Sequence, residues 1–368
     1  MEKLQTKRKN KSPRVLSVPT IRDRIVLFLL KELLHEVFQE SVVRKLPNQF
    51  VRDVTEFCKR SGHSSLKYFK TDIESFFDSI DHDILMAFIY KRIKSKKILR
   101  LITKCLKNPT VPAHYQRKDK LSSNNNLGVP QGISPANILA NIYLYSIDEE
   151  IKKNYMEYVR YVDDILIFHN VDSLKVKQQL ESELKYYKLK LNNQKTHNGE
   201  LKEGFEYLGY YISEPIISIK NSNVQKFITT ITAKFSSYKH NHGARLNKYP
   251  WLNKDIEKAV FLFDLNEKIT GAISEDKRYG WLFYFLEMND MALLHKLDSI
   301  ISNFFLRLDQ FNHTAPNQLK KLSKAYYKAK YDPYGGYIHN FGMYDDVKSK
   351  IKYLSDRGHL NPDNIYPE

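Results

Sequence analysis

The sequence predicts an α+β fold in which an antiparallel sheet packs against helices. Residues 67–73 (KYFKTDI) alternate and are rich in aromatic and β-branched side chains, which is typical of a strand. Residues 158–168 (YVRYVDDILIF) form two short strand-like runs around a pair of aspartates, and residues 205–213 (FEYLGYYIS) form another. The order of strand, helix, helix, strand hairpin, helix and strand favours an antiparallel sheet with helices on one face.

Two helices are predicted around the first strand. One covers 21–38, where Thr20 can cap the helix and Asp23 stands in the position of a capping-box acid. The other runs through 84–93 and begins after Asp81, which can cap it. The predicted buried stripe of the earlier helix consists of Ile21, Ile25, Val26, Leu29, Leu30, Leu33, Leu34, Val37 and Phe38.

Two more helices are predicted on either side of the aspartate hairpin. Ser134-Pro135 is typical of an N-cap followed by a first-turn proline, and this helix is expected to run to about Ile147. Residues 173–188 carry an apolar face at helical spacing. That face consists of Val176, Leu180, Leu184 and Tyr187.

Beyond about residue 220 the apolar pattern becomes helical, so a domain boundary is expected near 219–223. The last fifty residues, with KYDPYGGY at 330–337, favour irregular structure or short helices. The two apolar stripes of this half are Phe227, Ile231 and Phe235, and Leu294, Leu297, Ile301, Phe304 and Leu308.

Composition favours an intracellular protein with a polyanionic partner. The chain has 59 Lys and Arg against 42 Asp and Glu, a net charge of +17, and neutralising phosphates would release counterions. No run approaches the ~18 to 20 apolar residues of a membrane span, and no apolar signal core follows the basic start. Cys58 and Cys105 are too few for a disulfide framework or a zinc site. We therefore expect a cytoplasmic protein with no membrane partner.

The positive charge is clustered. Residues 1–24 contain eight Lys or Arg, and residues 84–118 contain ten without a single acid. Mutual repulsion would oppose folding unless phosphates or solvent screen these charges, so we expect the second cluster to contact a nucleic-acid backbone. The alternative is a solvated face whose cations also favour the C-terminal end of a helix.

Two acidic motifs about ninety residues apart carry the chemistry. They are Asp72 in KTDIESFFDSID and Asp163-Asp164 in RYVDDILIF. Adjacent carboxylates between strongly apolar flanks repel each other and are costly to desolvate. Hard carboxylate oxygens suit Mg²⁺ or Mn²⁺, and two such ions ~3.5–4 Å apart can drive phosphoryl transfer. Taken alone, a DD pair is more often a solvated turn or a helix cap than a metal site, and a lone Asp72 at a strand edge is no stronger evidence.

Five blocks within the first 215 residues resemble the reverse transcriptase family, specifically the bacterial branch related to group II intron enzymes. The blocks are SVPTIRDRIV (17–26), similar to the first fingers motif; KYFKTDIESFFDSID (67–81), similar to polymerase motif A; LGVPQGISPANILANIYL (127–144), similar to motif B; RYVDDILIF (160–168), similar to motif C; and NQKTHNG (193–199) with FEYLGYYIS (205–213), similar to motifs D and E. The spacing of PQG, YVDD and the motif A acid makes the match specific.

The resemblance implies a role for several residues. Asp72, Asp163 and Asp164 would hold two Mg²⁺ ions, or Mn²⁺. Ile73 would offer its backbone to the incoming triphosphate, and Phe77 would act as a steric gate that selects dNTPs. The remaining implied site residues are Gln131 and Gly132 against the nucleotide, Gly128 at a close backbone approach, and Lys195 as a proton donor to pyrophosphate.

The resemblance also implies a right-hand polymerase. Fingers and palm would occupy 1–218, an all-helical thumb 219–310, and a C-terminal extension 311–368. Its partners would be an RNA template, dNTPs and a DNA product, with a homo-oligomer or a partner protein also possible. The absence of an endonuclease motif makes the chain most similar to compact bacterial enzymes that work with a cognate noncoding RNA in antiphage defence.

Several alternatives share the same catalytic residues. A template-independent or protein-primed nucleotidyl transferase would use the same palm, and so would a retron or intron-derived reverse transcriptase. A non-enzymatic nucleic-acid-binding protein on a retired palm is a further alternative. The presence of all three aspartates together with Gln131 argues against that last interpretation.

Overall fold

The computed structural model describes residues 2–5, 14–62, 66–108, 111, 126–249 and 251–361. The chain forms two compact units, which we treat separately. The first comprises Met1–Leu46 and Glu56–Glu203, and the second comprises Pro47–Thr55 and Gly204–Glu368. The chain passes from one unit to the other after Glu203, within the stretch that the sequence assigns to the palm.

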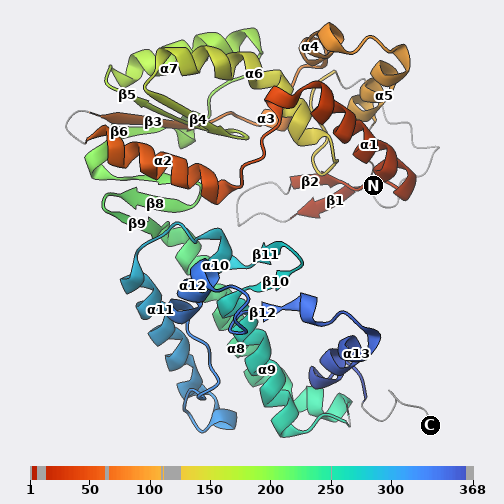
Figure 1. Ribbon diagram of the computed structural model, residues 1–368, viewed down its shortest axis with the longest axis vertical. Coiled ribbons are helices and arrows are strands. Elements are labelled where there is room, and N and C mark those ends of the chain that lie inside the picture. Colours follow the sequence, from red (N-terminus) through yellow and green to blue (C-terminus); the bar gives the residue numbers. More distant parts are fainter. Residues whose placement is uncertain are drawn as a thin grey trace. The chain divides into compact units, whose positions relative to one another are not determined.

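A four-stranded antiparallel sheet lies at the centre of the first unit, as the sequence predicted (Figure 1). Its order is β4-β5-β3-β6, so the strand before the first acidic motif pairs directly with the strand after the second. A separate ribbon pairs β1 (Glu2–Gln5) with β2 (Arg14–Ser17). The strands of the sheet are β3 (Lys67–Asp72), β4 (Glu157–Tyr161), β5 (Asp164–His169) and β6 (His197–Glu200).

Helices cover both faces of this sheet, whereas the sequence predicted helices on one face. Ile165 and Ile167 of β5 join a core with α6 (Ala136–Asn154) and α7 (Ser173–Tyr186). Phe168 points to the opposite face because side chains alternate along a strand. There its ring lies 5.0 Å from that of Phe57 on α2 (Pro47–Ser61). The strand is therefore apolar throughout rather than alternating, which explains the run ILIF.

The predicted caps at Thr20 and Asp81 are confirmed, whereas Ser134 does not cap α6, whose N-cap residue is Pro135. Thr20 caps α1 by accepting a hydrogen bond from the amide of Asp23. Asp81 caps α4 through the amides of Asp83 and Ile84, at 3.0 and 3.1 Å. Helix α6 begins at Ala136, after Pro135, and runs seven residues beyond the predicted end at Ile147. The helices are α1 (Ile21–Val37), α3 (Phe76–Ser79), α4 (His82–Arg92) and α5 (Lys96–Lys107), with short 3-10 turns η1 (Gln39–Ser41), η2 (Asn193–Lys195) and η3 (Leu201–Glu203).

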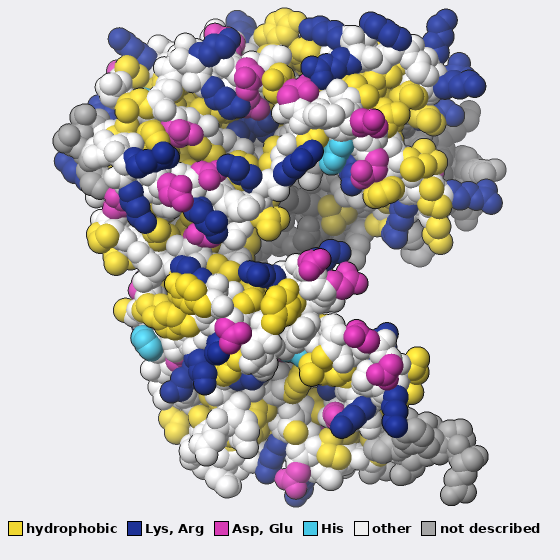
Figure 2. All heavy atoms as spheres, in the orientation of Figure 1, with side chains coloured by type: hydrophobic (Ala, Val, Ile, Leu, Met, Phe, Trp, Pro, Cys, Tyr) yellow, Lys and Arg dark blue, Asp and Glu magenta, His cyan; other side chains and the backbone are white. Residues whose placement is uncertain are grey.

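The predicted buried stripe of α1 is wrong in its N-terminal half. Leu30, Leu34 and Phe38 enter the core, but Ile21 is 78% exposed and Leu29 is 60% exposed. The first turns of the helix extend past the core that the structure describes, and their apolar side chains are exposed. Figure 2 shows hydrophobic side chains at the surface over α1.

The second unit begins with a three-stranded antiparallel sheet. The single predicted strand 205–213 is instead a hairpin of β7 (Phe205–Tyr207) and β8 (Tyr210–Ser213), joined to β9 (Ile216–Ile219). The reason is the Leu208-Gly209 pair, whose positive φ angles of 43° and 86° make a two-residue turn.

The rest of the second unit is mostly helical, and the predicted stripes on α8 and α11 are buried at Phe227, Ile231, Leu294 and Leu297. It is not all-helical, however. A hairpin of β10 (Ala272–Ser274) and β11 (Lys277–Tyr279) interrupts the helices, and β12 (His339–Asn340) pairs parallel to β10. The helices are α8 (Asn221–Lys248), α9 (Lys254–Thr270), α10 (Trp281–Tyr284), α11 (Met291–Phe304), α12 (Leu322–Tyr331) and α13 (Val347–Asp356), with 3-10 turns η4 (Phe305–Arg307), η5 (Asp309–Phe311) and η6 (Phe341–Met343).

Among the described helices, none is both long enough and apolar enough to cross a membrane.

Tyr143 is a buried polar link in the first unit that can be tested directly. Its hydroxyl accepts from the amide of Asp81 at 3.2 Å and donates to the carbonyl of Tyr187 at 2.7 Å. Because Tyr143→Phe leaves both groups without this partner, we expect a loss of about 1–3 kcal/mol in the free energy of unfolding. Urea denaturation measures it. Tyr90→Phe, at a half-exposed position on α4, is the control, and equal effects of the two changes would contradict the role.

Candidate active site

The three predicted acidic residues lie at one end of the central sheet. Asp72 ends β3 and is the direct register partner of Asp164, which begins β5. Asp163 occupies the turn between β4 and β5, and its carbonyl accepts a hydrogen bond from the amide of Ile73 at 3.0 Å. Residues about ninety positions apart are therefore joined by backbone pairing. The sheet itself, rather than a mobile loop, sets where the acids stand.

The turn that carries Asp163 is strained. Val162 has a φ of +59°, which is unfavourable for a β-branched residue and persists only where surrounding contacts hold it. Arg160 supplies such a contact, because its Nη1 donates to the carbonyl of Val162 at 2.8 Å. The same atom lies 3.3 Å from Oδ1 of Asn141 on α6.

Arg160 is itself fixed by a buried ion pair. Its guanidinium donates to both carboxylate oxygens of Asp148 on α6, at 2.7 and 2.5 Å, and its side chain is 6% exposed. The hydroxyl of Tyr158 donates to the same carboxylate at 2.7 Å. Burial disfavours the charge, but the contact with Asp148 raises the pKa of Arg160, so it stays protonated. The Arg160 guanidinium, bound to both oxygens of Asp148 and to the carbonyl of Val162, therefore links the turn to α6.

Sequence analysis did not single out Arg160 or Asp148. A signal was available, because Tyr158 and Arg160 are two residues apart on a strand and must share a face. A charged residue on an inward face requires a partner of opposite charge. Identifying Asp148 as that partner requires knowing how α6 crosses the sheet.

Two lysines lie against the acids. The Nζ of Lys195, on η2, donates to Oδ2 of Asp72, as its predicted place beside the site requires. Burial opposes its charge, but the hydrogen bond with Asp72 raises the pKa of Lys195. Lys70 was not predicted, although it precedes Asp72 by two residues and shares its face of β3. Its Nζ lies 3.4 Å from Oδ1 of Asp164.

The surroundings of Asp164 disfavour its charged form. Burial raises its pKa to about 6, nearby Lys70 lowers it and nearby Asp72 raises it. Its Oδ1 is buried and makes no hydrogen bond within the described part of the chain, since Lys70 is at ion-pair distance only. A buried carboxylate oxygen without a hydrogen bond is the kind of atom that a cation can satisfy.

The chemistry of these donors fits a divalent cation, whereas the present side-chain positions do not gather them around one. Among the residues that the structure describes, no three ligating side chains are close enough to hold a metal ion as they stand. The ammonium groups of Lys195 and Lys70 neutralise Asp72 and Asp164 instead. The Lys195 side chain is half exposed and therefore free to move aside.

A cavity of about 350 Å³ brings together three of the four predicted nucleotide-binding residues and leaves out Ile73. Phe77 is half-buried at its wall, whereas Phe76 is 3% exposed and belongs to the core. Two backbone hydrogen bonds hold the walls of the cavity. The amide of Val129 donates to the carbonyl of Phe77, and the amide of Ser17 donates to the carbonyl of Gln131. The cavity is lined by Leu16, Phe77, Gln131, Gly132, Ile133, Ser134, Ala136 and Asn137.

The two glycines of this region adopt positive φ angles and lie close to neighbouring backbone. Gly132 has a φ of +96°, and a Cβ there would stand 3.1 Å from the carbonyl oxygen of Ser17. Gly128 has a φ of +90°, and a Cβ there would stand 3.3 Å from the carbonyl oxygen of Asp78. Ile73 fits its prediction less directly. Its amide already donates to Asp163, so a triphosphate could use that amide only if this bond opened.

The basic stretch 84–118 is only partly described. Its residues 109–110 and 112–118 lie outside the described part, with Arg117 and Lys118 among them. Arg92 has a structural role, because it pairs with Glu40 at 2.7 Å and donates to the carbonyl of Val37 at 2.9 Å. Contact of the remaining lysines with phosphates stays a prediction.

Two known proteins are similar to this chain in sequence. The chain is 29% identical over 158 residues to the group II intron-encoded protein LtrA of Lactococcus lactis subsp. cremoris, covering 42% of this chain and 25% of LtrA. It is 24% identical over 248 residues to protein YkfC of Escherichia coli K12, covering 54% of this chain and 62% of YkfC. The chain thus spans less than two thirds of either relative.

Among solved structures, similarity is found to telomerase of Candida tropicalis in complex with a fragment of telomeric RNA. The TM-score is 0.45 at 15% identity, covering 97% of this chain and 64% of that one. The model of the family described as reverse transcriptase (RNA-dependent DNA polymerase) matches residues 5–212, which is more than half of the chain. The chain therefore belongs to the reverse transcriptase family of RNA-dependent DNA polymerases.

Proposed function

We propose that this chain synthesises DNA on an RNA template, with Asp72, Asp163 and Asp164 holding two Mg²⁺ ions, or Mn²⁺. The observation that carries the proposal is the register pairing of Asp72 with Asp164, with Asp163 tied to the same strand end. Bound divalent ions would activate the attacking 3′-hydroxyl and stabilise the departing oxygen. The chain's own part is to hold carboxylates at a fixed position on a rigid sheet.

The protein groups around the acids have distinct tasks in this proposal. Lys195 keeps a proton on its Nζ beside Asp72, from which a departing pyrophosphate can receive it. Phe77 presents its ring to the cavity that it shares with Gln131 and Gly132, where it leaves no room for a ribose 2′-hydroxyl. dNTPs are therefore preferred over rNTPs.

RNA recognition rests on charge. The net charge of +17 favours a phosphate backbone, and the face in Figure 2 shows Lys and Arg side chains spread over the first unit. We assign fingers and palm to 1–218, a thumb to 219–310 and an extension to 311–368. A cognate noncoding RNA and a part in antiphage defence stay predictions from the resemblance. Sequencing the product against an added template separates templated synthesis from template-independent transfer.

Asp163→Asn should abolish nucleotide addition while the protein stays folded. Losing one anionic metal ligand should lower the rate by ~10²–10³-fold, whereas relief of like-charge repulsion should leave stability unchanged or raised. Extension of a DNA primer on an RNA template with Mg²⁺ and dNTPs measures the rate. Asp83→Asn, at an exposed acid on α4, is the matched control. Wild-type turnover by Asp163→Asn would overturn the metal-site assignment.

Phe77→Val should admit rNTPs, because a smaller side chain opens the cavity beside Gln131. The measurement is the ratio of kcat/KM for dNTP and rNTP, together with a thermal melt. If Phe77 were only a core residue, truncating it would destabilise the protein by a few kcal/mol and leave that ratio unchanged.

Arg160 is proposed as a positioning residue for the Asp163 turn. Arg160→Lys keeps a charge but cannot fork between Asp148 and the carbonyl of Val162, so kcat should fall ~10–100-fold while KM for dNTP changes little. Steady-state primer extension separates the two constants.

A second variant distinguishes positioning from stability. Arg160→Met alone leaves Asp148 buried without its cation and should destabilise the fold by about 3–5 kcal/mol. Adding Asp148→Asn removes that buried charge and keeps an acceptor for Tyr158, so much of the stability should return. If kcat returned as well, Arg160 would be structural only.

A further inference from the structure

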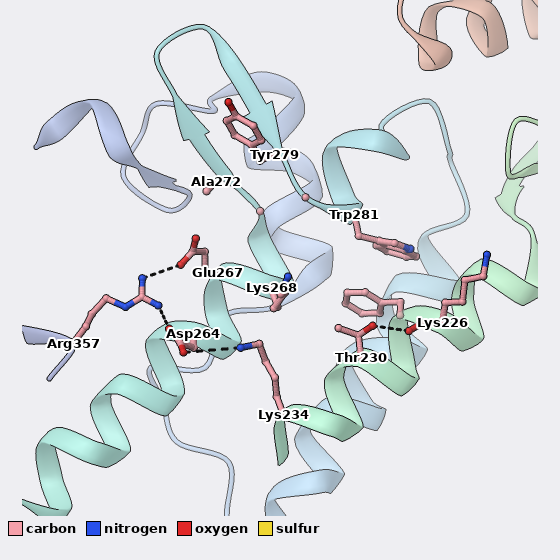
Figure 3. Close-up of a pocket in the computed structure, with 13 residues that line it drawn as sticks. Lys226, Thr230, Lys234, Asp264, Glu267, Lys268, Ala272, Tyr279, Trp281 and Arg357 are labelled. Carbon is pink, nitrogen blue, oxygen red and sulfur yellow. Dashed lines mark hydrogen bonds and ion pairs between the residues drawn. The ribbon is translucent and has the colours of Figure 1, made fainter. Parts of the chain in front are cut away.

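A second cavity lies wholly within the second unit, apart from the residues of the candidate active site. Its volume is about 490 Å³, within the ~300–1,000 Å³ of small-ligand pockets. Its walls come from α8, α9, α10, the β10–β11 hairpin and Arg357, which follows α13 (Figure 3). No task in the proposed polymerase reaction has been assigned to it.

The cavity carries an excess of positive charge. Arg357 pairs with both carboxylates of the lining, directly with Asp264 and at 3.5 Å with Glu267, and Lys234 lies 4.0 Å from Asp264. Figure 3 shows these pairs together on one side. The other two cations of the lining, Lys226 and Lys268, form no ion pair with a carboxylate among the described residues, and Nζ of Lys226 donates only to the amide oxygen of Asn223, at 3.3 Å.

Aromatic rings form the opposite side of the cavity. Trp281 stacks on Phe227 with ring centroids 4.3 Å apart, and Tyr279 on the hairpin is 49% exposed. Figure 3 shows Trp281 on the side away from Arg357, and Tyr279 on the hairpin above the cavity. The indole Nε1 of Trp281 is buried and has no hydrogen-bond partner within the described ranges. A buried donor without a partner is unfavourable, so an acceptor from a ligand or water would stabilise it.

Two glycines bring the helix end and the hairpin together at this wall. Gly271 has a φ of +71°, and a Cβ there would stand 2.3 Å from the carbonyl oxygen of Tyr279. A Cβ on Gly280 would stand 2.6 Å from the Cα of Gly271. The close crossing holds Tyr279 and Trp281 at the cavity in fixed backbone positions.

We propose that this cavity binds a nucleoside phosphate, either as a free mononucleotide or as an unpaired nucleotide of a strand. The base lies against the aromatic side that carries Trp281, and the lysines of the lining supply the positive charge for the phosphate. Aromatic stacking together with unpaired cations is the usual chemistry for unpaired nucleotides. An acidic peptide would use the cations but would leave the aromatic wall without a partner.

Tryptophan fluorescence tests the proposal. The chain has two tryptophans, so Trp251→Phe leaves Trp281 as the sole reporter. The full chain is titrated with AMP, a single-stranded RNA pentamer, adenosine, inorganic phosphate and oligoglutamate. EDTA is present throughout, so that metal-dependent binding at the polymerase site does not contribute to the signal. This cavity proposal, which rests on no part of the polymerase reaction, can therefore fail or succeed independently of the proposed function. AMP or the pentamer should quench Trp281 saturably, and adenosine and phosphate should each bind at least about tenfold more weakly.

The contribution of the lysine charges is tested with Lys226→Gln/Lys268→Gln, which removes both and should weaken binding of the nucleotide at least about tenfold. Lys239→Gln/Lys254→Gln removes two exposed lysines from the same two helices outside the cavity and should leave the affinity unchanged. Saturation by AMP alone identifies a free nucleotide, and tighter binding of the pentamer identifies a strand. Equal effects of the two double variants, preference for oligoglutamate, or no quenching by either nucleotide probe would overturn the proposal.

Discussion

Asp72 and Asp164 face each other across adjacent strands, and like charges at such a site raise the free energy of the folded protein. Much of the first unit compensates for this pairing. The apolar run of β5 supplies burial on both faces of the sheet, and it fixes the register that places the acids opposite each other. Lys195 and Lys70 supply opposite charge. A sheet that is otherwise well packed can therefore tolerate one unfavourable pair at its end.

The strained turn beside these acids is held by a different mechanism. Val162 keeps a positive φ because the guanidinium of Arg160 holds its carbonyl, and Asp148 holds the guanidinium. A buried ion pair adds little net stability, since desolvation offsets the attraction, but it fixes one geometry. Its position between α6 and the turn links the nucleotide cavity to the acids, because α6 begins at Ala136 in the wall of that cavity. Geometry, rather than stability, is what this pair contributes.

Local signals predicted local structure well. The strand before Asp72, the hairpin around Asp163 and the caps at Thr20 and Asp81 all depend on residues near one another in sequence. The errors came from tertiary packing. Whether the apolar residues at the start of α1 meet a core depends on where the core ends, which periodicity does not encode. The β10–β11 hairpin was missed because three-residue strands carry too short a pattern to detect.

The site shows the same division between sequence and space. The resemblance pointed to Asp72, Phe77, Gln131 and Lys195, and the structure places them in two groups. No rule of sequence spacing connects Arg160 with Asp148 on a separate helix.

The net charge of the sequence does not show which cations can bind a partner, because that depends on which of them the fold pairs with carboxylates. Some cations of this basic chain are already engaged, with Arg92, Arg160 and Arg357 each bound to carboxylates. A net charge of +17 therefore overstates the charge available to a partner at any one place. Binding depends on cations whose charge the fold leaves uncompensated, because only these gain a new partner when phosphate arrives. Lys226 and Lys268 form no ion pair with a carboxylate among the described residues, and they line a cavity that also contains Tyr279 and Trp281. A lysine on a solvated face offers its charge without such an aromatic neighbour.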